Sequence, residues 1–169
     1  MDKDQIASIV SRVLSEVQDP GGGRTQMPET VCMTLPLARA LADLVEAEAA
    51  RRNMRVVVAV ADGAGHTRLV HSMDDAFIGS LDAAVNKAFT CVAFRMSTGK
   101  LSALAQPGAP LYGIQHTNGG RIVIFGGGEP LRVNDRIIGA LGISGGTAEE
   151  DEALAAWGAA RLKEVISCL

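Results

Sequence analysis

The chain of 169 residues is 47% hydrophobic, 4% aromatic and 21% charged, and its formal net charge at pH 7 is −3. This length suits one compact domain with a short appendage, and the absence of a basic block disfavours nucleic-acid binding. No apolar run reaches the roughly 20 residues of a membrane span, and the few aromatic rings offer little stacking surface to a flat cofactor.

Residues 1–18 have the pattern of an amphipathic helix. Apolar side chains recur every three or four positions and share one helical face, and they are Ile6, Ile9, Val10, Val13, Leu14 and Val17. Residues 19–32 begin with Asp-Pro-Gly-Gly-Gly, which ends the helix and predicts a flexible linker. Such a helix is marginal alone, so its apolar face needs a partner. That partner is either its own domain or an oligomer mate, or another protein to which it docks as a targeting peptide.

The rest of the chain, residues 33–169, is expected to form one domain. Thr34 is a candidate N-cap for a helix that runs to about Arg52. Residues 56–61 and 67–71 are predicted strands of a hairpin, since a glycine turn joins the two runs.

Helices and a glycine-rich stretch follow. Ser80 is expected to open a second helix, and Ser97 is expected to cap a short continuation through Leu104. Residues 106–120 hold two prolines and four glycines, which predicts a loop.

Three short apolar runs are predicted to complete the sheet, over residues 121–125, 130–133 and 136–143. Thr147 then begins the last helix, with Glu150 positioned to complete a capping box. Short hairpins favour an antiparallel sheet, so we expect an α/β fold of the α+β type. About five antiparallel strands would have helices packed over them.

Two groups of glycines are candidate binding elements. Gly126 and Gly127 lie between predicted strands, where they either allow close approach of a ligand or form a bulge or turn. Gly145, Gly146 and Thr147 connect a strand to a helix, where free N–H groups favour a phosphate or carboxylate. The alternative there is a tight turn with an N-cap, because acidic residues already crowd the first turn.

Lysine, histidine and cysteine side chains supply the remaining candidates. Lys87 falls in an apolar helical run, where it would pair with Asp82, bind an anionic ligand or extend to solvent. His116, in the glycine-rich loop, is the preferred ligand candidate, followed by His71 on a predicted strand. Neither the histidine nor the cysteine spacing indicates a metal site or a disulfide framework, and Cys91 is expected to be a buried thiol. No nucleophile motif is recognisable, so the sequence leaves open whether the protein is an enzyme.

Several segments, taken in order, resemble the GlcG/HbpS-like family, which includes the C-terminal domain of PduO-type proteins and is often described as haem-degrading. They include VAVADGAGH at 58–66, GGRIVIFGGG at 119–128 and GISGGT at 142–147, together with residues 73–76, 80–84, 87–88, 106–108 and 130–132. The resemblance implies a profilin-like fold, a homo-oligomer and a haem or corrinoid-related ligand. Haem would need an axial ligand, and the motifs assign it to no particular histidine.

Members of this family recur in gene clusters for bacterial microcompartments, whose cargo is typically recruited by a short amphipathic helix on a flexible linker. Residues 1–18 resemble such an encapsulation peptide. The hypothesis is therefore a cytoplasmic cargo protein inside a microcompartment, with shell or other cargo proteins as partners, a small-molecule or haem-like ligand, and neither nucleic acid nor membrane. Two alternatives are an enzyme for a small anionic metabolite near Lys87 and the turn at 145–147, and a non-catalytic structural oligomer.

Overall fold

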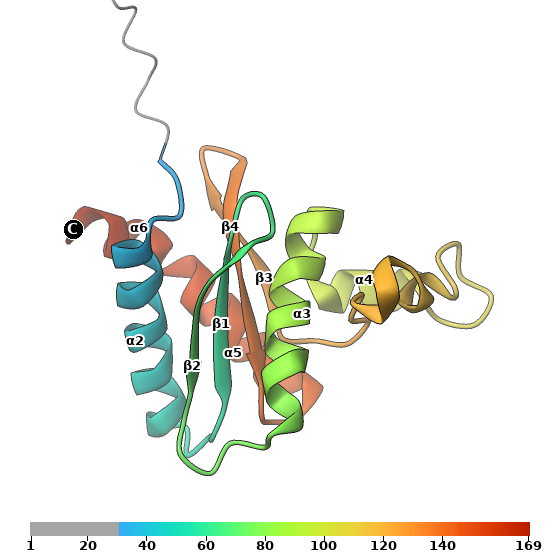
Figure 1. Cartoon of the computed structure of the whole chain (residues 1–169), viewed down its shortest axis with the longest axis horizontal. Helices are drawn as coiled ribbons and strands as arrows, with labels where there is room; N and C mark the ends of the chain where they lie inside the picture. The colour runs from blue at the N-terminus through green and yellow to red at the C-terminus, as the bar shows by residue number, and fades with distance from the viewer. Residues whose placement is uncertain (1–30) are drawn as a thin grey trace, which may run out of the picture. The chain divides into compact units, whose positions relative to one another are not determined.

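The computed structural model describes residues 31–169, so the predictions for the helix at 1–18 and nearly all of the linker lie outside the described residues. Figure 1 shows an antiparallel sheet flanked by helices. In chain order the elements are α2 (Leu35–Arg51), β1 (Val57–Asp62), β2 (Thr67–Ser72), α3 (Gly79–Phe94), α4 (Thr98–Leu104), the 3-10 helices η1 (Ile114–His116) and η2 (Asn118–Gly120), β3 (Gly128–Val133), β4 (Arg136–Ser144), α5 (Ala148–Ala160) and α6 (Leu162–Ser167).

The sheet has the strand order β2-β1-β4-β3, and every neighbouring pair is antiparallel. Side chains of β1 alternate between its two faces, as the pleat requires. Val58 and Val60 belong to the larger core under α2, α5 and α6, whereas Val57 and Ala59 face α3 together with Ala84. This is the predicted α/β fold, with helices on both faces of the sheet.

The α3 face is built from small residues, so the helix lies close to the strands. A Cβ atom added to Gly142 of β4 would collide with the carbonyl oxygen of Ala84 in α3. Cys91 and Ala140 fill the same layer, and both are buried.

The sheet has four strands within residues 31–169, so the expectation of about five is wrong by one. The predicted strand at 121–125 is not part of the sheet. Instead, the backbone N–H of Val123 donates to the hydroxyl of Thr90 on α3 at 3.0 Å, and the Arg121 guanidinium stacks 3.8 Å from the centroid of the Phe89 ring. The segment therefore lies beside α3, and the N–H of Val123 finds its acceptor on that helix rather than on a neighbouring strand.

The predicted N-caps are found at the starts of α2, α4 and α5, whereas the predicted extent of the last helix differs from the observed one. The hydroxyls of Thr34 and Ser97 accept from the backbone N–H groups of Leu37 and Lys100, as N-caps of α2 and α4 do. The C-terminal helix, expected as one, is divided at Arg161 into α5 and α6. No helix in the described part of the chain is long and apolar enough to cross a bilayer.

Candidate functional site

The β1–β2 and β3–β4 turns lie at the same end of the sheet (Figure 1). A cavity of about 810 Å³ is lined by residues of both turns. The segment preceding α2 and the C-terminal end of α3 complete its wall. Among the side chains that line it are four arginines and two aspartates, namely Arg68, Arg95, Arg132, Arg136, Asp62 and Asp135. The lining therefore carries an excess of two positive charges, although the whole chain is acidic.

The arginines are available to an anionic ligand. Within residues 31–169, none of the four lies within ion-pair distance of a carboxylate. Arg132 donates to the backbone carbonyls of Arg95 at 2.8 Å and Asp135 at 3.2 Å, which ties the β3–β4 turn to the end of α3. Guanidinium groups bind carboxylates and phosphates through paired, charge-assisted hydrogen bonds. The cavity thus has the chemistry of an anion site.

Asp62 is one of the two acidic residues in the cavity lining. Its carboxylate accepts from the backbone N–H groups of Ala64 at 2.9 Å and His66 at 3.0 Å, which closes the β1–β2 turn. Partial burial acts to raise the pKa of Asp62, but these N–H donors outweigh it, and the pKa lies below its usual value. The carboxylate is therefore ionised at neutral pH and bound to its own turn.

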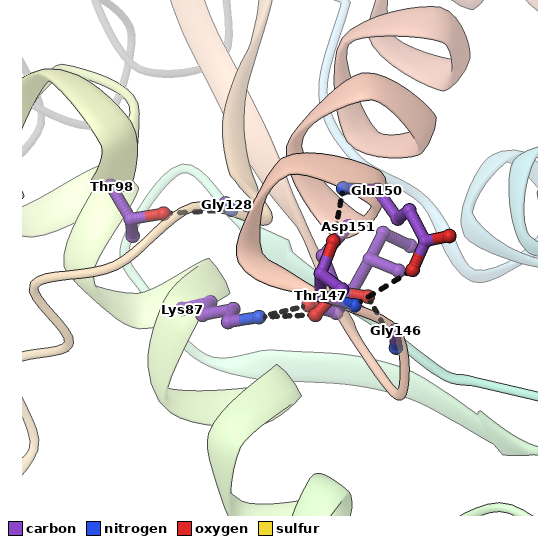
Figure 2. A network of polar contacts seen from close by, with 8 residues as sticks. Lys87, Thr98, Gly128, Gly146, Thr147, Glu150 and Asp151 are labelled. Atoms are coloured by element: carbon purple, nitrogen blue, oxygen red, sulfur yellow. Dashed lines mark hydrogen bonds and ion pairs between the residues drawn. The ribbon is translucent and has the colours of Figure 1, made fainter.

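A second polar cluster surrounds Lys87, and its contacts are internal (Figure 2). The Lys87 ammonium donates to Asp151 Oδ2 at 2.8 Å and to the carbonyl of Ile143 at 2.6 Å, and it lies 4.8 Å from the centroid of the Phe125 ring. The side chain is fully buried. Burial lowers its pKa, against the opposing effect of Asp151. The partner is therefore Asp151 and not Asp82, and the lysine does not extend to solvent.

The strand-to-helix turn beside this pair also binds its own carboxylates. Asp151 Oδ1 accepts from the N–H of Gly146 at 2.9 Å, and Glu150 accepts from the N–H of Thr147 at 2.9 Å. The Thr147 hydroxyl accepts in turn from Glu150, which completes the predicted capping box. The N–H groups of Gly146 and Thr147, which an external anion would use, thus already bind carboxylates of this chain. This agrees with the alternative of a tight turn with an N-cap.

The glycine run at 126–128 brings backbone close to the same lysine. A Cβ atom at Gly127 would lie 2.5 Å from Lys87 Nζ and from the carbonyl oxygen of Ile143, and its φ of +116° favours glycine. The N–H of Gly128 donates to the Thr98 hydroxyl at 2.9 Å. These glycines accordingly pack against the chain's own polar cluster, near Gly146 and away from the cavity.

The two preferred histidines lie apart from the cavity and from the lysine cluster. His116 is exposed on η1, where its Nε2 lies 3.5 Å from the amide of Gln115. His71 is half-buried on β2, and its Nδ1 lies 3.0 Å from Glu46 Oε2. Cys91 is buried as expected, and burial raises its thiol pKa to about 12.

Sequence reasoning missed the cavity arginines altogether. They come from β2, the end of α3, β3 and β4, so no local spacing connects them. The only signal is that three of them flank the two hairpin turns, which antiparallel pairing brings to one end of the sheet.

Comparison with known proteins finds matches over most of the described chain. A family described as "Haem degrading protein HbpS-like" matches residues 33–160. A 15.0 kDa Citrobacter freundii protein from the dhaT-dhaS intergenic region is 50% identical over 73% of this chain and 87% of its own length. The corrinoid adenosyltransferase PduO of Salmonella typhimurium is 44% identical over 57% of this chain, which spans 29% of that protein.

Solved structures agree with these sequence matches. The Klebsiella pneumoniae protein ORFY has a TM-score of 0.76 at 40% identity, covering 81% of this chain and 95% of its own. A PduOC–haem complex has a TM-score of 0.73 at 36% identity, covering 77% of this chain and 94% of its own.

Proposed function

The chain belongs to the HbpS-like family of haem-degrading proteins, and we propose that it binds haem, or a related anionic macrocycle, in the arginine-lined cavity. The observation that carries this proposal is the excess of positive charge around a cavity of about 810 Å³. Cofactor sites typically occupy about 300–1,000 Å³, and haem bears two propionate groups that guanidinium groups bind well. The haem complex of the related PduOC supports the same ligand.

The donor set of the cavity fits haem. Arg68 and Arg136 are free of carboxylate partners among residues 31–169 and would hold the propionates. The exposed thiol of Cys32 and the thioether of Met33 also line the cavity, and both sulfur types ligate haem iron in proteins. Bound haem would supply redox chemistry, while the arginines and sulfur groups of the cavity would hold and orient it.

Haem titration of the full chain, followed by the Soret band, tests the proposal. We expect a saturable shift at micromolar haem, and a further change in band position for Cys32→Ser if sulfur ligates the iron. His116→Ala and His71→Ala serve as matched controls, because neither histidine lines the cavity. A Soret band that does not shift, or that changes only with a histidine variant, would contradict the assignment of the cavity.

The protein is also proposed to act as a homo-oligomer. Three apolar side chains within the five-residue span 77–81, at the start of α3, are exposed, with exposed fractions of 72% for Phe77, 93% for Ile78 and 44% for Leu81. Such a patch is costly in water and is typical of an interface. A second copy of this chain is the expected occupant.

The remaining part of the proposal concerns residues 1–18, which are proposed to recruit the protein to a bacterial microcompartment in the cytoplasm. The support is their apolar periodicity and the glycine linker that follows. Residues 1–20 fused to a fluorescent reporter should give foci when co-expressed with shell proteins. Val10→Asp in the apolar face should make the signal diffuse, whereas Ser11→Asp on the polar face should not. Diffuse fluorescence of the unaltered fusion would count against recruitment.

The enzyme alternative, an anionic metabolite near Lys87, gains no support from the geometry. Lys87 and the N–H groups at Gly146 and Thr147 already have carboxylate partners.

A further inference from the structure

We propose that Asp135 makes the arginine-lined cavity selective for macrocycles with two carboxylate groups over those with four or more. The inference rests on the function proposed above, in which the cavity holds an anionic macrocycle. Asp135 lines the cavity on the turn that joins β3 to β4, next to Arg136 in the chain. A negative charge at that position opposes the binding of every anion, and it opposes the most highly charged anions most.

The conformation of the turn does not explain an aspartate at this position. Val133 pairs with Arg136, so Asn134 and Asp135 form a two-residue hairpin loop. Both loop residues have positive φ, 48° for Asn134 and 62° for Asp135, and glycine is the residue that such a loop favours at its second position. Asp135 therefore holds a left-handed conformation that glycine adopts at lower cost. Strained positions of this kind cluster at binding sites.

The Asp135 carboxylate is also free to act on a ligand. Its side chain is exposed, and within residues 31–169 it has no lysine or arginine within ion-pair distance. The other aspartate of the lining, Asp62, instead accepts from the backbone N–H groups of its own turn. Asp135 is thus the acidic residue of the cavity whose charge has no partner of its own in the described part of the chain.

Two of the four arginines are less able than the others to bind carboxylates. Arg132 donates to the backbone carbonyls of Arg95 at 2.8 Å and Asp135 at 3.2 Å. Arg95 is the C-cap of α3, where the helix dipole places partial negative charge. Arg68 and Arg136 remain as the best-placed cations, and two guanidinium groups match two carboxylates.

The charge of the whole lining gives the same number. Four arginines and two aspartates leave an excess of two positive charges, which two carboxylates neutralise. Each further carboxylate enters a cavity with no excess positive charge and is repelled by Asp135. Without the Asp135 charge, four arginines would face one aspartate and the excess would be three. Loss of this charge should therefore favour a tetracarboxylate more than a dicarboxylate.

Fluorescence titration of the full chain with two metal-free porphyrins tests this selectivity. Mesoporphyrin has two carboxylates and coproporphyrin has four, and without iron no axial ligand contributes to either affinity. We expect the parent to bind mesoporphyrin more tightly. In Asp135→Asn the ratio of the two affinities should fall at least threefold, because coproporphyrin gains more. Asparagine preserves the shape and tolerates positive φ, and Asp135→Gly should give the same shift in a turn that suits glycine.

Asp75→Asn is the matched control. Asp75 is another exposed aspartate with positive φ, at 66°, and it does not line the cavity, so this variant should keep the preference of the parent. The selectivity proposal is overturned, and the proposed cavity function survives, if the parent binds both porphyrins equally. The same holds if neither Asp135 variant changes the ratio, or if Asp75→Asn changes it as much. A parent that binds neither porphyrin would overturn both the selectivity and the function of the cavity.

Discussion

At the scale of single residues, the buried ammonium of Lys87 depends on Asp151. Lys87→Met would leave the Asp151 carboxylate buried with no cationic partner, and breaking a buried pair in this way costs about 3–5 kcal/mol. We expect urea denaturation to show a loss of this size in the free energy of unfolding. The exposed variant Lys163→Met should differ from the parent by about 0.5 kcal/mol or less. A loss below about 1 kcal/mol in Lys87→Met would mean that the pair does not hold α3 to α5.

Cysteine reactivity should separate one thiol from the other two. The pKa of Cys91 is raised to about 12 by burial, so this thiol is protonated and shielded at pH 8, whereas Cys32 and Cys168 are exposed. Alkylation at pH 8 followed by mass spectrometry should give two adducts on the native protein and three after denaturation. A third adduct on the native protein would show that Cys91 is accessible.

The unusual character of Lys87 is apparent from the sequence, but its partner is not. A lysine within an apolar helical run must find a counter-charge, and local spacing offers only Asp82. The actual partner, Asp151, is 64 positions away, and β4 and the turn after it bring it to the lysine. The packing of α3 and α5 against the sheet creates that pairing, and no local spacing reveals it.

At the scale of elements, α3 lies against β4 because Gly142 has no side chain. Gly142→Ala would force its Cβ into the carbonyl of Ala84 and separate helix from strand, at an overpacking cost of about 1–3 kcal/mol. Gly79→Ala, at the start of the same helix, meets nothing within 4 Å and should leave stability unchanged or raise it by up to about 1 kcal/mol. Thermal denaturation of both variants measures the difference. Equal melting temperatures would contradict the close packing of α3.

Caps and hairpins were predictable because they depend on neighbours in sequence. Each N-cap hydroxyl accepts from the backbone N–H three positions ahead, and these caps are Thr34, Ser97 and Thr147. The β1–β2 hairpin forms around one short turn. The run at 121–125 has strand composition, but the hydroxyl of Thr90 competes for its backbone. Thr90 and Val123 are far apart in the chain, so the local sequence does not reveal this hydrogen bond.

At the scale of the whole molecule, the exposed apolar patch at 77–81 should control assembly. Ile78→Asp places a charge in the proposed interface, and because the side chain is 93% exposed its replacement should not disturb the fold. We expect light scattering after size exclusion to show a smaller species than the parent. Leu169→Asp, at another exposed apolar position, is the control. A monomeric parent, or an unchanged mass in Ile78→Asp, would exclude this interface.

The cavity illustrates why a proposed binding site can be missed by sequence reasoning that predicts the fold. No arginine of the lining has an unusual sequence context. The four come together only because antiparallel pairing brings both hairpin turns to one end of the sheet. The histidines were selected for their chemistry, and His71 and His116 do not line the cavity.

The central claim is that the arginine-lined cavity binds haem, and the haem dissociation constant of a charge-reversed variant tests it most directly. Arg68→Glu combined with Arg136→Glu changes the lining from an excess of two positive charges to an excess of two negative ones. Soret titration should show at least a tenfold weaker affinity for this variant. Arg39→Glu, on an exposed position of α2 outside the cavity, should bind like the parent. An unchanged dissociation constant in the double variant would contradict the claim.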